Sequence, residues 1–264
     1  MYPILFSLGK INIYSYGFMV ALTLLLGIIW VGRAVEKRKL ATFDQIIDFA
    51  IYVIIGGLAF AKLFQIIVEF DLFLKEPKEI FSGSSGSFFG GVFGGILLGV
   101  YYTKKKKIST WKLADIIAQY IPLGHIIGRT GCLLSGCCYG VPTDLPWALR
   151  CSSDHLLRHP TQIYEMLGNL IIFVILGMIN RRAEKQGKVY FPGFIFWLYV
   201  GLYSAIRIIV EIFRESQIMA FGWLRTTQFF CFIIMIAVFL YIAYKFKNQK
   251  KVEKEVNASS TIHS

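Results

Sequence analysis

Seven long apolar runs alternate with short polar segments along the 264-residue chain. A helix needs about 17–25 apolar residues to cross the hydrocarbon core of a bilayer, and most of these runs reach that length. The pattern therefore predicts an all-α integral membrane protein with about seven transmembrane helices, at residues 14–31, 43–68, 88–102, 113–127, 164–179, 192–213 and 227–244.

The third run is rich in glycine, at positions 90, 91, 94, 95 and 99. Glycines three and four residues apart leave a smooth helix face, which lets another backbone approach closely within lipid. We therefore expect this segment to pack tightly against a neighbouring helix.

The composition agrees with a membrane protein. Hydrophobic residues make up 56% of the chain and charged residues only 17%, whereas soluble domains carry about 25% charged residues. We expect one membrane domain over residues 1–245 and a polar, disordered tail over residues 246–264. The sequence contains no internal repeat, and we expect no cofactor.

The basic residues alternate between the two sides of the predicted membrane. Loops after the first, third and fifth runs, together with the tail, carry 18 lysines and arginines, whereas the remaining loops and the N-terminus carry 7. Under the positive-inside rule, the N-terminus lies outside and the C-terminus in the cytoplasm. The net charge of +12 is then explained by contact with anionic lipid rather than with nucleic acid.

A polar stretch, residues 125–140, interrupts the pattern where the fourth run is expected to give way to a loop. It contains His125, Arg129, three cysteines and several glycines. An unpaired arginine in the membrane costs about 2.5–3.5 kcal/mol on insertion scales, so Arg129 needs a partner or an exit to water. A snorkelling arginine followed by a glycine-rich turn is the simpler alternative.

Four of the five cysteines lie in this stretch or in the predicted loop that follows it, at positions 132, 137, 138 and 151. Their spacing is not a standard zinc pattern, and we expect no metal. Cys151 could pair with Cys137 or Cys138 in an oxidising compartment. The alternative is that the thiols pack as small apolar side chains.

Polar residues of several segments meet at one predicted depth near the outer face. Arg207 and Glu211 are four apart and share a helix face, which also fits a self-neutralising pair. Guanidinium groups match phosphate oxygens, so the set indicates a site for an anionic headgroup, although anchoring to the interface is the alternative. Its members are Arg129, Arg207, Arg214, His159, Gln162 and Glu165.

Four stretches in this order resemble bacterial prolipoprotein diacylglyceryl transferase, over roughly residues 3–245. They are Phe6-Ser-Leu-Gly9 with Tyr16-Gly17, residues 121–131, residues 158–165 (Arg-His-Pro-Thr-Gln-Ile-Tyr-Glu) and residues 203–215. The resemblance implies an enzyme of the bacterial cytoplasmic (inner) membrane. Such an enzyme moves diacylglyceryl from phosphatidylglycerol to the lipobox cysteine thiol of a preprolipoprotein, giving a thioether and glycerol phosphate.

The resemblance also implies roles for individual residues. Catalytic roles fall to Arg129, Arg207, Glu211, Tyr16 and Glu165. Among the residues near the outer face, we expect substrate binding by Arg129, Arg207, Arg214, His159, Gln162 and His125. His125 is explained equally well as a packing residue.

The sequence departs from the family pattern in two places. Phe89 stands where the family usually has a histidine, and Cys132, Ser135 and Cys137 stand where it usually has polar or acidic residues. The general base is therefore not identified. Because the family reaction uses no enzyme nucleophile, we expect Cys132, Cys137 and Cys138 to be individually replaceable by serine with partial activity. Two alternatives stay open: a family member with another lipid or thiol acceptor, and a membrane protein that binds or transports an anionic lipid without chemistry.

Overall fold

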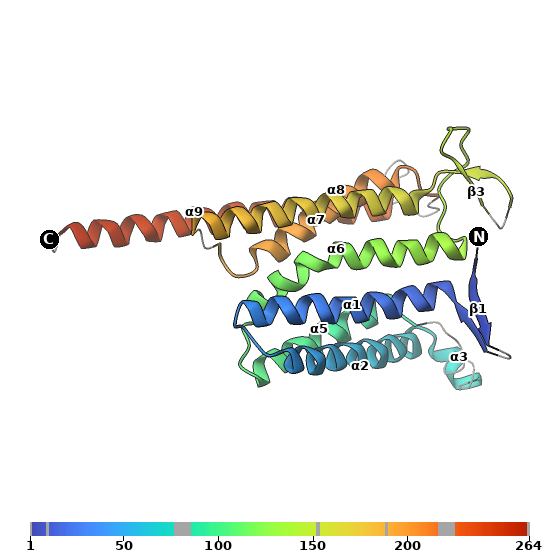
Figure 1. Ribbon diagram of the computed structural model, residues 1–264, viewed down its shortest axis with the longest axis horizontal. Helices are drawn as coiled ribbons and strands as arrows, with labels where there is room; N and C mark the ends of the chain where they lie inside the picture. Colours follow the sequence, from blue (N-terminus) through green and yellow to red (C-terminus); the bar gives the residue numbers. More distant parts are fainter. Residues whose placement is uncertain are drawn as a thin grey trace. The chain divides into compact units, whose positions relative to one another are not determined.

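The structure is a computed structural model, and it describes residues 2–8, 11–76, 86–151, 154–187, 190–215 and 225–262 (Figure 1). The described chain is mainly helical. Its helices are α1 (Ser15–Lys37), α2 (Phe43–Val68), α3 (Phe70–Lys75), α5 (Phe88–Lys105), α6 (Thr110–Ser135), α7 (Thr161–Gln186), α8 (Phe194–Glu211) and α9 (Thr226–Ile262). Two short antiparallel hairpins join β1 (Ile4–Leu8) to β2 (Ile11–Tyr14), and β3 (Leu149–Arg150) to β4 (Leu157–Arg158).

Each of the seven predicted segments coincides with a helix, so the predicted all-α class is confirmed. Among the described residues, five helices are long and apolar enough to cross a membrane: α1, α2, α7, α8 and residues Thr226–Gln249 of α9. A crossing by α5 and α6 remains a prediction.

Three differences from the prediction matter most. Helix α6 continues to Ser135, so Arg129 and Cys132 lie on a helix and not in a loop. Helix α9 continues to Ile262, through most of the segment for which we expected disorder; lysine, glutamate and alanine are good helix formers there. The N-terminal residues, which the hydropathy pattern left without an element, form the β1–β2 hairpin.

Helix α6 remains helical past Gly128 and Gly131, and Gly131 lies in a close contact with α1. A Cβ atom on Gly131 would lie 3.0 Å from the Cβ of Met19 and 3.4 Å from the Cα of Tyr16 on α1. The missing side chain therefore lets the start of α1 approach the end of α6. Thr23 of α1 also lies close to α6, with its hydroxyl oxygen 3.5 Å from the carbonyl oxygen of Gly124.

The chain divides into two compact units, residues 28–113 and residues 1–27 with 114–264. In the first unit, α5 packs against α2 through its glycines, as predicted. Gly90, Gly94, Gly95 and Gly99 are buried on α5, and Gly56 is buried on α2. A Cβ atom on Gly90 would lie 2.5 Å from the carbonyl oxygen of Phe60 and 2.7 Å from the Cβ of Phe64.

Adjacent glycines on α5 allow a direct test of this packing. Gly90→Ala should destabilise the protein by about 1–3 kcal/mol, because the new methyl group overlaps the α2 backbone. Gly91→Ala is the matched control, since its Cβ would lie 3.5 Å from the nearest atom and alanine favours a helix. Thermal unfolding in detergent measures both, and equal melting temperatures would contradict the proposed steric origin.

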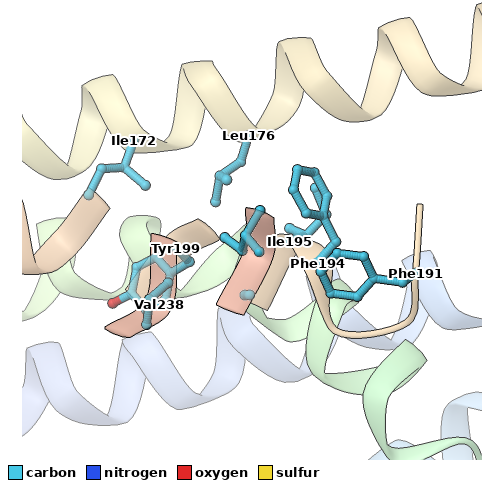
Figure 2. Packing of buried hydrophobic residues seen from close by; sticks show 9 residues of the cluster. Ile172, Leu176, Phe191, Phe194, Ile195, Tyr199 and Val238 are labelled. Atoms are coloured by element: carbon cyan, nitrogen blue, oxygen red, sulfur yellow. The ribbon is translucent and has the colours of Figure 1, made fainter. Parts of the chain in front are cut away.

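In the second unit, α8 packs against both α7 and α9 around an apolar core (Figure 2). The buried side chains of this core are Ala118, Ile172, Leu176, Phe191, Phe194, Ile195, Tyr199, Val238 and Ile242. Asp115 of α6 accepts hydrogen bonds from the backbone N–H groups of Gly193 (2.7 Å) and Phe196 (2.9 Å). A carboxylate at a helix N-terminus satisfies unpaired donors there, so Asp115 ties α6 to the start of α8.

Candidate active site

The loop after α6 is held to the ends of α7 and α8 by backbone hydrogen bonds. The N–H of Gly140 donates to the carbonyl of His159, and the N–H of Val141 donates to the carbonyl of Phe213, each at 2.9 Å. A Cβ atom on Gly140 would collide with the Phe213 carbonyl, so only glycine fits this position. These bonds bring together the charged residues of α6, α7 and α8.

Glu165 is the centre of the charged cluster that results. Its carboxylate accepts from Nη2 of Arg129 and from Nη1 of Arg207, each at 2.6 Å. Arg214 approaches the same carboxylate at 3.5 Å, and Arg207 also pairs with Glu211 at 2.9 Å. The structure thus joins the predicted Arg207–Glu211 pair to three residues that the sequence placed only at a common depth, Arg129, Glu165 and Arg214.

Counted over its arginines and glutamates, the cluster carries one excess positive charge, because three guanidinium groups face two carboxylates. The side chains of Glu165 and Glu211 are each 3% exposed, whereas that of Arg129 is 21% exposed and that of Arg214 is 28% exposed. The buried carboxylates therefore orient the arginines, and the arginines keep donors that reach solvent. Such an arrangement suits a singly charged anion with several oxygen acceptors.

Arg158 supports the site from its rim. It pairs with Asp154 at 2.5 Å and with Glu215 at 2.6 Å, and it donates to the carbonyl of Gly140 at 3.0 Å. The hydrogen bond from Arg158 lowers the pKa of Asp154. These contacts fix the loop against the residues that follow α8.

The predicted substrate-binding residues His159, Gln162 and His125 lie around the cluster, not in it. Gln162 is buried and donates to the carbonyl of Cys137. His159 is buried too, with Nδ1 3.0 Å from the hydroxyl of Tyr164. The Nδ1 atom of His125 lies 3.2 Å from Oδ1 of Asn169, which agrees with the packing interpretation of this histidine.

Tyr16 lies in the first turn of α1, beside Gly131 of α6. Its side chain is half exposed. Within the described part of the chain, no hydrogen bond joins its hydroxyl to the arginine–glutamate cluster. Tyr16 does interact electrostatically with Arg129, so it lies near the cluster without bonding to it, and its catalytic role stays a prediction.

Asn169 is a buried polar residue of this region that the sequence analysis missed. It lies one turn after Glu165 on α7, is fully buried and donates to the Glu165 carbonyl at 2.8 Å. Because it also contacts His125, it links α6 to α7 behind the cluster. The sequence signal that could have revealed it is a single asparagine within an apolar run.

All five cysteines are free thiols, so the suggested pairing of Cys151 with Cys137 or Cys138 is absent. Instead, the sulfur atoms of Cys132, Cys137 and Cys138 all lie within 4.8 Å of one another. A hydrogen bond from the thiol of Cys132 lowers the pKa of Cys138 to about 5. The free-thiol alternative is thus confirmed, and the structure adds that three of these thiols contact one another.

An apolar groove of about 830 Å³ runs along α7 and α8 beside the cluster. The sequence analysis did not predict it. The groove is lined by Leu145, Trp147, His159, Pro160, Ile163, Tyr164, Leu167, Gly168, Ile171, Ile206, Ile209, Val210 and Phe213. Two of these lining residues are hydrogen-bonded to each other, since Trp147 donates to the hydroxyl of Tyr164 at 2.8 Å.

Comparison with known proteins gives one consistent result. The sequence model of the prolipoprotein diacylglyceryl transferase family matches residues 3–244. A phosphatidylglycerol–prolipoprotein diacylglyceryl transferase of Clostridium tetani is 35% identical over 256 residues, covering 94% of this chain and all of the relative. A protein of the same name from Geobacter sulfurreducens is 36% identical over 224 residues, covering 81% of this chain and 83% of the relative.

Proposed function

Because the chain belongs to the prolipoprotein diacylglyceryl transferase family, we propose that it transfers diacylglyceryl from phosphatidylglycerol to the lipobox cysteine of preprolipoproteins. The thiolate sulfur attacks the glyceryl carbon that carries the phosphate ester. The C–O bond breaks, a C–S bond forms, and glycerol phosphate leaves. The thiol proton passes to the leaving phosphate or to solvent, so no oxidant or cofactor is required.

The observation that carries this proposal is the single excess positive charge of the arginine–glutamate cluster. A phosphodiester has one negative charge, which matches the three guanidinium and two carboxylate groups described above. The charge on the phosphate grows as the C–O bond breaks. Donors already oriented toward that charge lower the barrier without further reorganisation.

The role of each arginine in the cluster follows from how many of its N–H donors already bond to Glu165 or Glu211. Arg207 directs one Nη atom to Glu165 and the other to Glu211, whereas Arg129 gives only Nη2 to Glu165. We assign phosphate binding chiefly to Arg129 and Arg214, and additional charge stabilisation to Arg207. Glu165 and Glu211 act as positioning residues for these arginines.

The apolar groove is a suitable place for the acyl chains of the donor. Its walls are aliphatic and aromatic, and its lining residues adjoin Glu165 and Arg207 in the sequence. A headgroup bound at the cluster would therefore leave its chains next to an apolar surface. Burial of such chains supplies binding energy in proportion to the area removed from water.

Two leucines of α7 test this assignment. Leu167 lines the groove and Leu170 does not, although both are about half exposed. Leu167→Gln should raise the KM for phosphatidylglycerol roughly tenfold, since it removes about 1.5 kcal/mol of apolar contact. Leu170→Gln should leave KM unchanged. Kinetics in mixed micelles decide the matter, and equal effects of both substitutions would exclude the groove.

We further propose seven spans in the bacterial cytoplasmic membrane, with the N-terminus outside. The excess of basic residues in alternate loops supports this topology. Green fluorescent protein fused after residue 264 should fluoresce, whereas alkaline phosphatase at the same site should be inactive. An active phosphatase fusion would place the C-terminus outside the cytoplasm and contradict this topology.

The transferase activity itself is tested with the purified full chain, phosphatidylglycerol and a lipobox peptide. The expected result is a thioether-linked lipopeptide together with an equal amount of glycerol phosphate. A peptide with serine in place of the lipobox cysteine is the control. Lipid binding without either product would favour a non-catalytic lipid-binding protein.

A further inference from the structure

The three clustered thiols come from two structural elements that meet at a sharp turn. Cys132 lies in the last turn of α6, whereas Cys137 and Cys138 follow its end at Ser135. The sulfur of Cys138 lies 3.4 Å from that of Cys137, and all three sulfurs lie within 4.8 Å of one another. The chain thus gathers three soft donor atoms at one point.

The turn that gathers them is a Schellman motif. The N–H of Gly136 bonds to the carbonyl of Leu133, and the N–H of Cys137 bonds to the carbonyl of Cys132. Gly136 has a φ of +73°, which glycine adopts without strain. The turn reverses the chain so that residues five and six positions apart face each other, which the cysteine spacing alone did not indicate.

Cys138 adopts an unusual backbone conformation within this turn. Its φ is +68°, a left-handed conformation that costs a non-glycine residue roughly 1–2 kcal/mol. The surrounding bonds hold it there, since Thr161 donates to the Cys138 carbonyl at 2.6 Å and Gln162 donates to the Cys137 carbonyl. The fold therefore maintains a local strain that brings the third thiol to the other two.

The sulfur positions suit a tetrahedral metal ion. With metal–sulfur bonds of about 2.3 Å, the sulfurs of a tetrahedral zinc site stand roughly 3.8 Å apart. The observed separations, from 3.4 Å to no more than 4.8 Å, bracket this value, so small side-chain rotations would complete the site. Cys137 is exposed, which provides an entry path for the ion and for a fourth ligand.

The charges around the thiols also fit a bound cation. Three thiolates and a divalent ion would carry one net negative charge. Arg129 interacts electrostatically with all three thiols, and Arg214 with Cys138. These arginines would balance the charge of the loaded site.

We propose that Cys132, Cys137 and Cys138 form a binding site for a thiophilic metal ion of the zinc class. The three sulfurs are the protein ligands, and water or another small ligand completes the tetrahedron. The site fixes the turn that connects α6 to the start of α7. Its ligands take no part in the phosphate chemistry proposed above, although Arg129 and Arg214 interact with both sites.

The test is metal binding by the reduced, full-length protein in detergent. Cobalt(II) should bind at about one ion per chain and give thiolate-to-metal charge-transfer absorption, which zinc should abolish by displacement. Cys137→Ser and Cys138→Ser should each lower affinity for cobalt by at least about tenfold. Cys231→Ser, on α9 and outside the cluster, should bind as the unaltered chain does.

Other outcomes would overturn the proposal. Absence of charge-transfer absorption in the reduced, unaltered chain would do so, as would equal binding by all three variants. A Cys137–Cys138 disulfide that persists under reduction and excludes cobalt would do so as well. The exposed position of Cys137 makes its variant the most informative, because a serine there should leave the fold intact, which size-exclusion chromatography and thermal unfolding verify.

Discussion

Replacing Arg129 by lysine should reduce diacylglyceryl transfer about 10²- to 10³-fold. Lysine keeps the positive charge but loses the planar fork, which here holds Glu165 with one nitrogen and leaves others for the donor phosphate. Lysine presents all three of its N–H donors from a single nitrogen, so it cannot hold Glu165 and the phosphate in the fixed planar geometry of the fork. The loss should appear mainly in kcat, because the phosphate charge is greatest in the transition state.

Arg207→Lys should be impaired to a similar degree, since Arg207 bridges Glu165 and Glu211. Arg150→Lys is the matched control, because Arg150 is exposed on β3 and outside the cluster. The measurement is single-turnover transfer from phosphatidylglycerol to a lipobox peptide. Turnover by Arg129→Lys within a few fold of the unaltered protein would rule out the phosphate role.

Replacing Glu165 by glutamine should destabilise the protein by about 3–5 kcal/mol and abolish most of its activity. The amide cannot compensate three guanidinium groups, of which two lie at 2.6 Å and one at 3.5 Å. Repulsion among Arg129, Arg207 and Arg214 would then separate α6, α7 and α8 at this point. The melting temperature and the rate of diacylglyceryl transfer should both fall.

Glu215→Gln provides the comparison for this loss. Glu215 also accepts from an arginine at 2.6 Å, but its side chain is 57% exposed. An exposed ion pair contributes about 0–1 kcal/mol, so this variant should unfold within a few degrees of the unaltered chain. A Glu165→Gln protein as stable as Glu215→Gln would show that the buried carboxylate of Glu165 does not contribute the expected free energy to folding.

The helical segments could be predicted from sequence because apolar run length is set by bilayer thickness. Helix ends were harder, as α6 shows. Gly128, Gly131 and the cysteines at its end are typical of a loop, yet the segment is helical and Gly131 lies in a close contact with α1. Such a contact depends on residues more than a hundred positions away and leaves no local signal.

In the candidate site, too, contacts within one helix could be predicted from the sequence, and contacts between distant segments could not. The pairing of Arg207 with Glu211 follows from helical spacing and was predicted. The central place of Glu165 was not, because its partners Arg129 and Arg214 lie 36 and 49 residues away. The thiol cluster was also missed, since it depends on the left-handed turn at Gly136 and Cys138.

The position of the apolar groove determines whether the reaction rate depends on the concentration of phosphatidylglycerol within the membrane or on its total concentration in the sample. Because the groove lies along the sides of α7 and α8, and lining residues such as Leu167 and Ile209 are more than half exposed, a lipid can enter it sideways from the surrounding leaflet. The encounter is then two-dimensional. Turnover should follow the mole fraction of phosphatidylglycerol in the bilayer, and adding more vesicles of the same composition should leave the rate per membrane-bound enzyme unchanged.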